Sequence, residues 1–318
     1  MKRFVFHATA VLFVLVSFFG CKKQEAKEFV IATGGTSGVY YPLGNAIAEI
    51  WNNSVEGIHV TARATGGSVE NMNLLNKGEV QLAIVQNDIM DYAYRGIYMF
   101  SDRIQNLTTI GTLYDEVVHI VASKKSGIQS VDDFRGKRIS IGDVGSGCEF
   151  NAKQILEGYG IELTDIQKYN LSYKDAAEAI KSGQIDACFI ASGVPNAAIS
   201  ELAKNDEIVL IPVMGAPADK ICNNYNFYTK TVIPPRTYEN TTSGIPVLAV
   251  KATLAISSAV DEEIVYDMTK ALFDNLGALG KAHAKGKEVS PKTAVAGVSV
   301  PFHNGAIRYF SDMGLTIY

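Results

Sequence analysis

The chain has 318 residues, of which 47% are hydrophobic and 19% charged, which is the composition of a globular protein long enough for two compact domains. The formal net charge of -4 excludes a strongly basic surface, so nucleic-acid binding is not expected. After position 21 the cysteines are Cys148, Cys188 and Cys222, and their spacing does not fit a metal site. We expect them to be small buried or half-buried thiols.

The first twenty residues have the pattern of an export signal. Lys2 and Arg3 form a basic start, an almost wholly apolar run follows from Phe4 to Phe19, and Gly20 precedes Cys21. The apolar run is short for a transmembrane anchor. We therefore predict a lipoprotein signal over residues 1–20, lipidation of Cys21 and a charged tether over residues 21–28. The mature protein is then expected in the periplasm or cell envelope, attached to the membrane by its lipid.

The folded part begins with a predicted strand, loop and helix between Phe29 and Trp51. The loop from Thr33 to Gly38 is rich in glycine and hydroxyl side chains. Such a loop before a helix gives a bound group access to backbone N–H donors, and the helix start favours an anion. The simpler interpretation is that the glycines only make a tight turn. The loop has neither a Walker A lysine nor the dinucleotide fingerprint, so it suits a small polar ligand better than a nucleotide.

The same arrangement follows the next two predicted strands. The strand over residues 58–65 leads into Gly66-Gly67-Ser68 and a helix that Lys77-Gly78 closes. The strand over residues 80–85 is a near-continuous apolar run, as in a parallel sheet buried on both faces, and it ends in Gln86-Asn87-Asp88. In open parallel sheets, ligands bind outside the carboxyl ends of the strands.

The second half of the chain resembles the first half in the order of its elements. Strands are predicted over residues 117–123, 137–141 and 185–190, with a glycine-rich loop over residues 142–147 and a helix after it. Residues 75–83 resemble residues 180–188, and the loop at 36–38 resembles the loop at 145–147. Together these similarities predict two lobes of one α/β design whose loop ends face each other across a cleft.

The remaining segments carry weaker signals. Residues 223–242 are rich in Tyr, Pro and Thr and are expected to form a long ordered connection. Residues 247–250 are strand-like, and residues 261–275 have the spacing of an amphipathic helix.

Residue patterns that would indicate catalysis are absent from the sequence. The five histidines are scattered and none has HExxH spacing, and residues 144–148 do not form a G-x-S-x-G elbow. Cys148 at a helix start is more consistent with loop packing than with a nucleophile, and Asp132 and Asp133 with helix capping. We therefore expect a protein without catalytic residues, cofactor or metal.

Several segments match one known family. They are residues 34–44 (GGTSGVYYPLG), 64–71 (ATGGSVEN), 83–88 (AIVQND), 145–147 (GSG), 183–187 (GQIDA) and 269–273 (TKALF). By these segments the chain resembles the TAXI family, the extracytoplasmic solute receptors of TRAP (tripartite ATP-independent periplasmic) transporters. The resemblance covers essentially the whole chain after Glu28. The chain departs from it at Cys148, where Ser or Thr is usual, and at Arg63, where a neutral residue is common.

The resemblance implies an α/β, two-lobed type II periplasmic-binding-protein fold with the ligand in the interlobe cleft. Lobe 1 would comprise residues 29–116 and 247–318, and lobe 2 residues 117–246, with crossings near Val117 and Val247. It implies a non-enzyme that delivers its solute to a fused integral-membrane TRAP subunit, and we expect a monomer. Related receptors are associated with glutamate, glutamine or dicarboxylates such as 2-oxoglutarate.

The predicted ligand-binding residues share the chemistry of donors to a carboxylate, which are hydroxyls, carboxamides and bare backbone N–H groups. Arg63 could assist them, and Tyr40 and Tyr114 could form walls for an apolar part of the ligand, although core packing fits each tyrosine as well. The predicted site consists of Thr36, Ser37, Gly38, Tyr40, Gly67, Ser68, Gln86, Asn87, Tyr114, Gly145, Ser146, Gly147, Ser192 and Gly193.

Two other function classes fit the same sequence. One is an enzyme on the two-lobe scaffold, since a fold does not fix a function. The other is a surface lipoprotein that binds host or matrix material. Stabilisation by a small molecule without turnover would favour the receptor over both.

Overall fold

The computed structural model describes residues 26–204, 208–239 and 241–317. The predicted export signal over residues 1–20 and the predicted lipidation site Cys21 lie outside the described residues. Within the described ranges, no helix has the length and apolar character needed to cross a membrane.

Strands and helices alternate through most of the chain, as the sequence predicts. The strands are β1 (Lys27–Ala32), β2 (Ile58–Arg63), β3 (Leu82–Gln86), β4 (Leu107–Ser123), β5 (Arg138–Ser140), β6 (Gln167–Tyr169), β7 (Ala187–Ser192), β8 (Ile208–Leu210), β9 (Thr229–Ile233) and β10 (Ile245–Ser257). The helices are α1 (Tyr40–Ser54), α2 (Ser68–Asn76), α3 (Asn87–Arg95), α4 (Gly147–Gly158), α5 (Tyr173–Lys181), α6 (Ala197–Ala203), α7 (Gly215–Asn224), α8 (Glu262–Asp274), α9 (Leu276–Ala282), α10 (Pro291–Ala294) and α11 (Asn304–Asp312).

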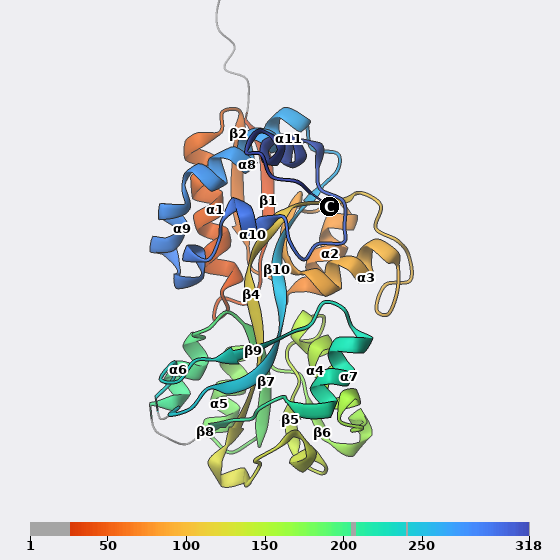
Figure 1. Ribbon diagram of the computed structural model, residues 1–318, viewed down its shortest axis with the longest axis vertical. Helices are drawn as coiled ribbons and strands as arrows, with labels where there is room; N and C mark the ends of the chain where they lie inside the picture. Colours follow the sequence, from red (N-terminus) through yellow and green to blue (C-terminus); the bar gives the residue numbers. More distant parts are fainter. Residues whose placement is uncertain (1–25, 205–207, 240, 318) are drawn as a thin grey trace, which may run out of the picture.

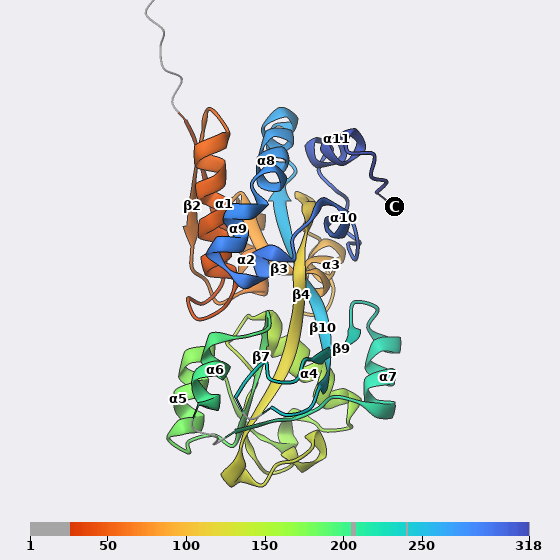
Figure 2. The same ribbon diagram turned by 60° about the vertical axis from the view of Figure 1, so that its left-hand side comes forward.

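The molecule has two lobes joined by two long strands. Figures 1 and 2 show β4 and β10 running side by side from one lobe into the other. The first lobe holds β1–β3, α1–α3 and α8–α11, and the second lobe holds β5–β9 and α4–α7. The strands form one sheet in the order β2-β1-β3-β10-β4-β7-β5-β6, with β8 on β4 and β9 on β10. This architecture confirms the predicted two-lobed α/β fold.

The two lobes repeat one strand arrangement. In the first lobe, β1 lies between β2 and β3 and pairs with both in parallel, and in the second lobe β5 pairs in the same way with β6 and β7. The strands β3 and β7 then pair antiparallel with β10 and β4. Because parallel strands end at the same edge of a sheet, the loops after them gather where the lobes meet.

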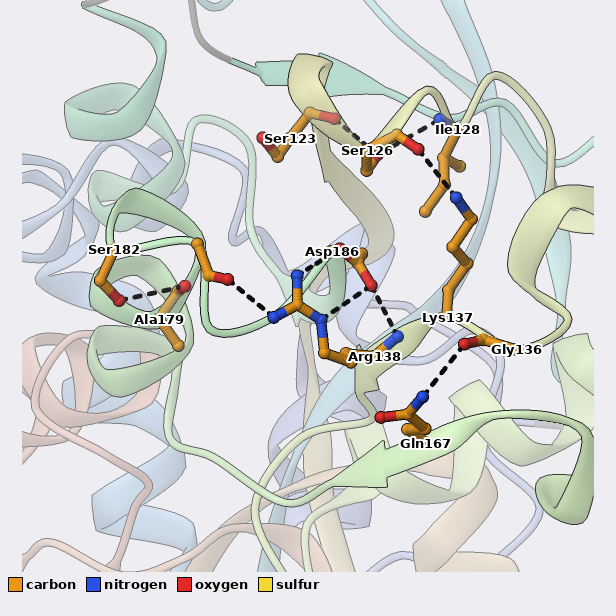
Figure 3. A network of polar contacts seen from close by, with 11 residues as sticks. Ser123, Ser126, Ile128, Gly136, Lys137, Arg138, Gln167, Ala179, Ser182 and Asp186 are labelled. Atoms are coloured by element: carbon orange, nitrogen blue, oxygen red, sulfur yellow. Dashed lines mark hydrogen bonds and ion pairs between the residues drawn. The ribbon is translucent and has the colours of Figure 1, made fainter.

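In each lobe, a polar side chain at the same position of the repeat accepts a hydrogen bond from the backbone of the central strand and so fastens that strand. The Gln81 side chain accepts a hydrogen bond from the backbone N–H of Val30 at 3.1 Å, and Asp186 accepts one from that of Arg138 at 2.8 Å. In the second lobe the Arg138 guanidinium also donates to both Asp186 oxygens and to the Gly183 carbonyl (Figure 3). The sequence similarity between residues 75–83 and 180–188 therefore corresponds to a structural repeat.

Each lobe has its own apolar core. In the first lobe the fully buried Trp51 donates its indole N–H to the Met268 carbonyl at 2.8 Å, which ties α1 to α8. In the second lobe the rings of Phe134 and Phe189 pack edge to face with centroids 5.9 Å apart. Burying each of these side chains contributes about 2–3 kcal/mol to folding.

Three expectations about the elements need correction. Strand β4 begins at Leu107 rather than near Val117. Thr108, Thr109 and Thr112 interrupt the apolar residues of its first part, so the search for apolar runs missed it. Residues 223–242 include the strand β9, which pairs with β10 and is not only a connection. The predicted lobe boundaries, 116/117 and 246/247, fall inside continuous strands and stay a prediction.

The predictions for the cysteines and for Asp133 as a capping residue are confirmed. Cys148 and Cys188 are buried free thiols and Cys222 is partly buried. The Asp133 carboxylate accepts hydrogen bonds from the backbone N–H groups of Gln129 and Ser130, as a helix cap does.

Candidate functional site

A pocket lies between the two lobes. The loops after β1, β2, β5 and β6 line it together with the last residues of β3 and β7, as expected for the carboxyl ends of parallel strands, and Glu116 of β4 completes the lining. Its lining residues are Gly34, Gly35, Ser37, Gly38, Val39, Tyr40, Gly66, Gly67, Ser68, Gln86, Glu116, Asp143, Ser146, Gly147, Cys148, Ser172, Tyr173, Ala191 and Ser192.

Most of the predicted site residues meet in this pocket. They come from both lobes, and they are Ser37, Gly38, Tyr40, Gly67, Ser68, Gln86, Ser146, Gly147 and Ser192.

Two predicted residues make structural contacts instead of lining the pocket. The Asn87 side chain donates to the Gly297 carbonyl at 2.9 Å and accepts from the Lys251 backbone N–H at 3.0 Å, so it joins the start of α3 to β10. Gly193 packs against the stem of the buried Lys285 side chain, and a Cβ at position 193 would lie 2.6 Å from Lys285 Cγ.

Three further predicted residues also lie outside the lining. Thr36 is exposed at the tip of its loop. Tyr114 is buried on the same face of β4 as Glu116, and its hydroxyl has no partner among the described residues. The Gly145 carbonyl accepts from the backbone N–H groups of Val69 and Glu70 at 3.1 and 3.3 Å, so Gly145 joins the lobes directly.

Donors gather on one side of the pocket. Helix α1 begins at Tyr40 without a side-chain cap at Val39, which leaves its first N–H groups without a capping side chain next to the lining residues Ser37 and Gly38. The 15-residue α1 also directs its positive end there. This side of the pocket suits a carboxylate.

The Gln86 side chain lies between the lobes and is held on one side only. Its Nε2 donates to Asn151 Oδ1 on α4 at 2.9 Å, while its Oε1 is buried without a partner in the described structure. The closeness of the lobes here requires glycine at position 147, because a Cβ on Gly147 would lie 1.8 Å from Gln86 Oε1. Such an orphaned acceptor at a pocket wall is a site for a ligand donor.

Glu116 is a buried acidic lining residue that the sequence analysis missed. Its carboxyl is only 5% exposed, and its Oε2 accepts a hydrogen bond from the Tyr40 hydroxyl at 2.8 Å. Burial raises the pKa of Glu116 to about 8, against the opposing effect of the Tyr40 hydrogen bond. The available signal was an acidic residue directly before an apolar strand, which is uninformative until β4 is known to start at Leu107.

Two lining residues from the second lobe, Tyr173 and Asp143, were also not predicted from the sequence. Tyr173 donates its hydroxyl to the Ala191 carbonyl at 2.6 Å, and Asp143 lies at the partly exposed edge. Cys148, noted as a departure from the family pattern, also lines the pocket, and burial raises the pKa of its thiol to about 12. A thiol in this state is not a nucleophile at neutral pH.

Arg63 does not assist the site. Its guanidinium lies on the surface, 3.9 Å from Glu79 Oε2, and Arg63 is not a lining residue. The lining as described contains no lysine or arginine. In the described ranges, no group of three or more His, Cys, Asp or Glu residues is placed to hold a metal ion.

Two solved structures show the same fold class. One is a protein from Bordetella bronchiseptica RB50, with a TM-score of 0.57, 16% identity and coverage of 90% of this chain and 98% of that chain. The other is the binding protein component of an ABC phosphonate transporter from Pseudomonas aeruginosa, with a TM-score of 0.56, 12% identity and coverage of 82% and 79%. The molecule is thus a two-lobed protein of the periplasmic-binding-protein fold. The chain belongs to the NMT1-like family, whose model matches residues 31–314.

Proposed function

We propose that this protein is an extracytoplasmic solute receptor, which captures a small carboxylate solute between its lobes and delivers it to a membrane permease. The observation that carries the proposal is the pocket itself, because both lobes contribute polar lining groups and its donor side faces the start of α1. The matching binding component of a phosphonate transporter has the same fold, which supports a transport role. Glutamate, glutamine and dicarboxylates are the first solutes to test.

The lining favours binding over catalysis. The Ser146 hydroxyl donates to the Asp143 backbone carbonyl at 2.8 Å, so it is not activated by a base. Cys148 is held as a thiol by burial, as described above. A pocket whose hydroxyl and thiol groups are engaged in this way suits a receptor better than a hydrolase or transferase.

The finer assignments rest on the sequence. The TAXI-type motifs support a TRAP permease with a fused membrane subunit as the partner. Gly20-Cys21 supports export and a lipid anchor. We propose that the receptor is a monomer. Replacing Cys21 by Ala in the full chain and fractionating the cell envelope tests the anchor, since a lipidated wild type and a soluble or unprocessed variant are expected.

A thermal-shift screen tests the proposed class most directly. The protein is incubated with amino acids and dicarboxylic acids, and each stabilising compound is recovered and analysed. A rise in melting temperature with the compound unchanged is the expected result, because a ligand that binds only the native state stabilises it. Chemical conversion would favour the enzyme, and no stabilisation by any carboxylate would contradict the proposal.

A further inference from the structure

One wall of the pocket offers acceptors only when Glu116 is ionised. The orphaned Gln86 Oε1 and the Glu116 carboxyl both belong to this wall, and both residues are almost fully buried, at 2% and 5% exposure. One Glu116 oxygen accepts from the Tyr40 hydroxyl at 2.8 Å, and the Gln86 amide is a second hydrogen-bond neighbour of the carboxyl. Acceptors in this arrangement match a ligand group with several N–H donors.

The orientation of the Gln86 amide follows from its neighbours. Asp88 Oδ1 accepts from the Ile89 backbone N–H at 2.8 Å, and its Oδ2 accepts from Asn151 Nδ2 at 3.1 Å. That contact turns Asn151 Oδ1 toward Gln86, whose Nε2 must then be the donor. Gln86 Oε1 is therefore the unpartnered acceptor of this amide, and it lies against Gly147 of the pocket lining.

The same Asn151 amide is held from the second lobe. Its Nδ2 also donates to the Tyr228 hydroxyl at 2.8 Å, and this hydroxyl donates in turn to Gln154 Oε1 at 2.6 Å. The direction of each hydrogen bond in the chain is thus fixed by the next, so the acceptor wall is built into the contact between the lobes.

The charges of the lining residues also favour a ligand group with several N–H donors. The described lining carries two acidic side chains, Glu116 and Asp143, and no basic one. A dicarboxylate would bring two negative charges to this lining without a cation to offset them. A solute with an ammonium group beside its carboxylate places a positive charge against the acceptor wall and a negative charge at the start of α1.

We propose, on the basis of the receptor function above, that Glu116 and Gln86 Oε1 bind the ammonium group of a zwitterionic α-amino acid. The solute class is thereby narrowed to amino acids, and dicarboxylates without nitrogen are excluded. Tyr40 positions the Glu116 carboxyl through its hydroxyl.

Binding of such a ligand is coupled to a proton. Burial raises the pKa of Glu116 to about 8, so at pH 7 the empty site holds mainly the neutral acid. An ammonium group favours the carboxylate, and the displaced proton passes to solvent. The titratable groups that act on Glu116 or are acted on by it come from five elements, and they are Tyr40, Asp88, Tyr114, Cys148 and Tyr173.

Calorimetry with three matched solutes tests the proposal. L-Glutamate, 2-oxoglutarate and glutarate share two carboxylates and a five-carbon chain and differ only at the α-carbon. We expect glutamate to bind the wild type at least tenfold more tightly than either of the others. Glu116→Gln should reduce glutamate affinity by about tenfold to a hundredfold, because one charge-assisted hydrogen bond is lost, and should spare glutarate.

Controls separate the possible failures. Asp115→Asn removes the neighbouring acid, which points to solvent and pairs with Lys251, and should retain the glutamate preference. Wild-type titrations in phosphate and Tris at pH 7 should differ in heat, because a proton is released on binding. Equal affinities for glutamate and glutarate, or a preference unchanged in Glu116→Gln, would overturn the ammonium site and leave the receptor intact. Binding of neither amino acids nor dicarboxylates would overturn the receptor as well.

Discussion

Among single residues, Glu116 lines the pocket at a cost to the stability of the fold. A carboxyl that is about 95% buried is easier to bury protonated than charged, so this residue makes the empty protein less stable at alkaline pH. Its partner Tyr40 offers one hydrogen bond, which does not offset the loss of hydration. Such a cost at a pocket wall is expected where a ligand supplies the missing charge.

The stability of the ligand-free protein should therefore fall as pH rises. The pKa of Glu116 is about 8 in the native state and 4.5 in the reference state, so the native protein binds more protons between these values. The free energy of unfolding then decreases from about pH 5 to pH 8, by about 1.4 kcal/mol for each pKa unit. Glu116→Gln should make this decrease smaller in calorimetric melts, with the remainder due to buried Asp88, whose pKa is also raised, to about 7, while Asp115→Asn should follow the wild type. Parallel profiles for Glu116→Gln and wild type would contradict the assignment.

The limits of sequence interpretation are clearest at Glu116 and Asn87. The loops rich in glycine and hydroxyl side chains can be recognised from the sequence because their pattern lies within a few consecutive residues. Ser37, Ser68 and Ser146 from these loops do line the pocket. Glu116 lies in mid-strand, where burial depends on partners distant in sequence. Asn87 has an amide that could bind a ligand, but this amide already forms hydrogen bonds with Gly297 and Lys251. Both partners are distant in sequence, so no local pattern predicts these bonds.

At the scale of elements, the repeat between the lobes is the main organising feature. Each lobe places a glycine-rich loop before a helix, α1 or α4, and fastens its central strand through a polar side chain, Gln81 or Asp186. Apolar periodicity was sufficient to predict most of these elements. It missed the first part of β4 and all of β9, whose threonine-rich stretches are strands because β10 lies beside them.

Both fastening side chains should stabilise their lobes, and Asp186, with three hydrogen bonds from Arg138, should contribute more than Gln81. Asp186→Ala leaves the backbone N–H and the guanidinium of Arg138 without their acceptor. Gln81→Ala leaves the Val30 N–H without its acceptor. Each substitution should lower the free energy of unfolding by about 1–3 kcal/mol. Urea denaturation measures this. The control is Gln167→Ala, which removes an exposed hydrogen bond of 3.3 Å to the Gly136 carbonyl (Figure 3). If Asp186→Ala and Gln81→Ala cost no more than Gln167→Ala, the fastening role is wrong.

At the scale of the whole molecule, the lobes touch directly around the pocket. Asn151 on α4 joins Gln86 and Asp88 of the first lobe, and the rings of Tyr92 and Phe150 meet across the lobes with centroids 5.3 Å apart. Two-lobed proteins close by bending at a few connecting residues, here within β4 and β10 (Figure 2). The contacts of Asn151 should then hold the closed arrangement.

Asn151→Asp should open the protein. The substitution places a second carboxyl against Asp88, and two buried like charges repel strongly unless the lobes separate. Small-angle X-ray scattering at pH 8 should give a larger radius of gyration for this variant than for wild type without ligand. Asn45→Asp makes the same change at an exposed position of α1 and should leave the radius unchanged. An unaltered radius for a folded Asn151→Asp protein would mean that this contact does not control closure.

The central claim, that a small solute binds in the interlobe pocket, is tested most directly by titrating the best solute from the screen into Gln86→Ala. Calorimetry should show one solute per wild-type chain and an affinity about tenfold to a hundredfold lower in the variant, since a buried acceptor is removed. Gln81→Ala, the same substitution remote from the pocket lining, should bind as wild type does. Wild-type affinity in Gln86→Ala would place the solute elsewhere and contradict the account.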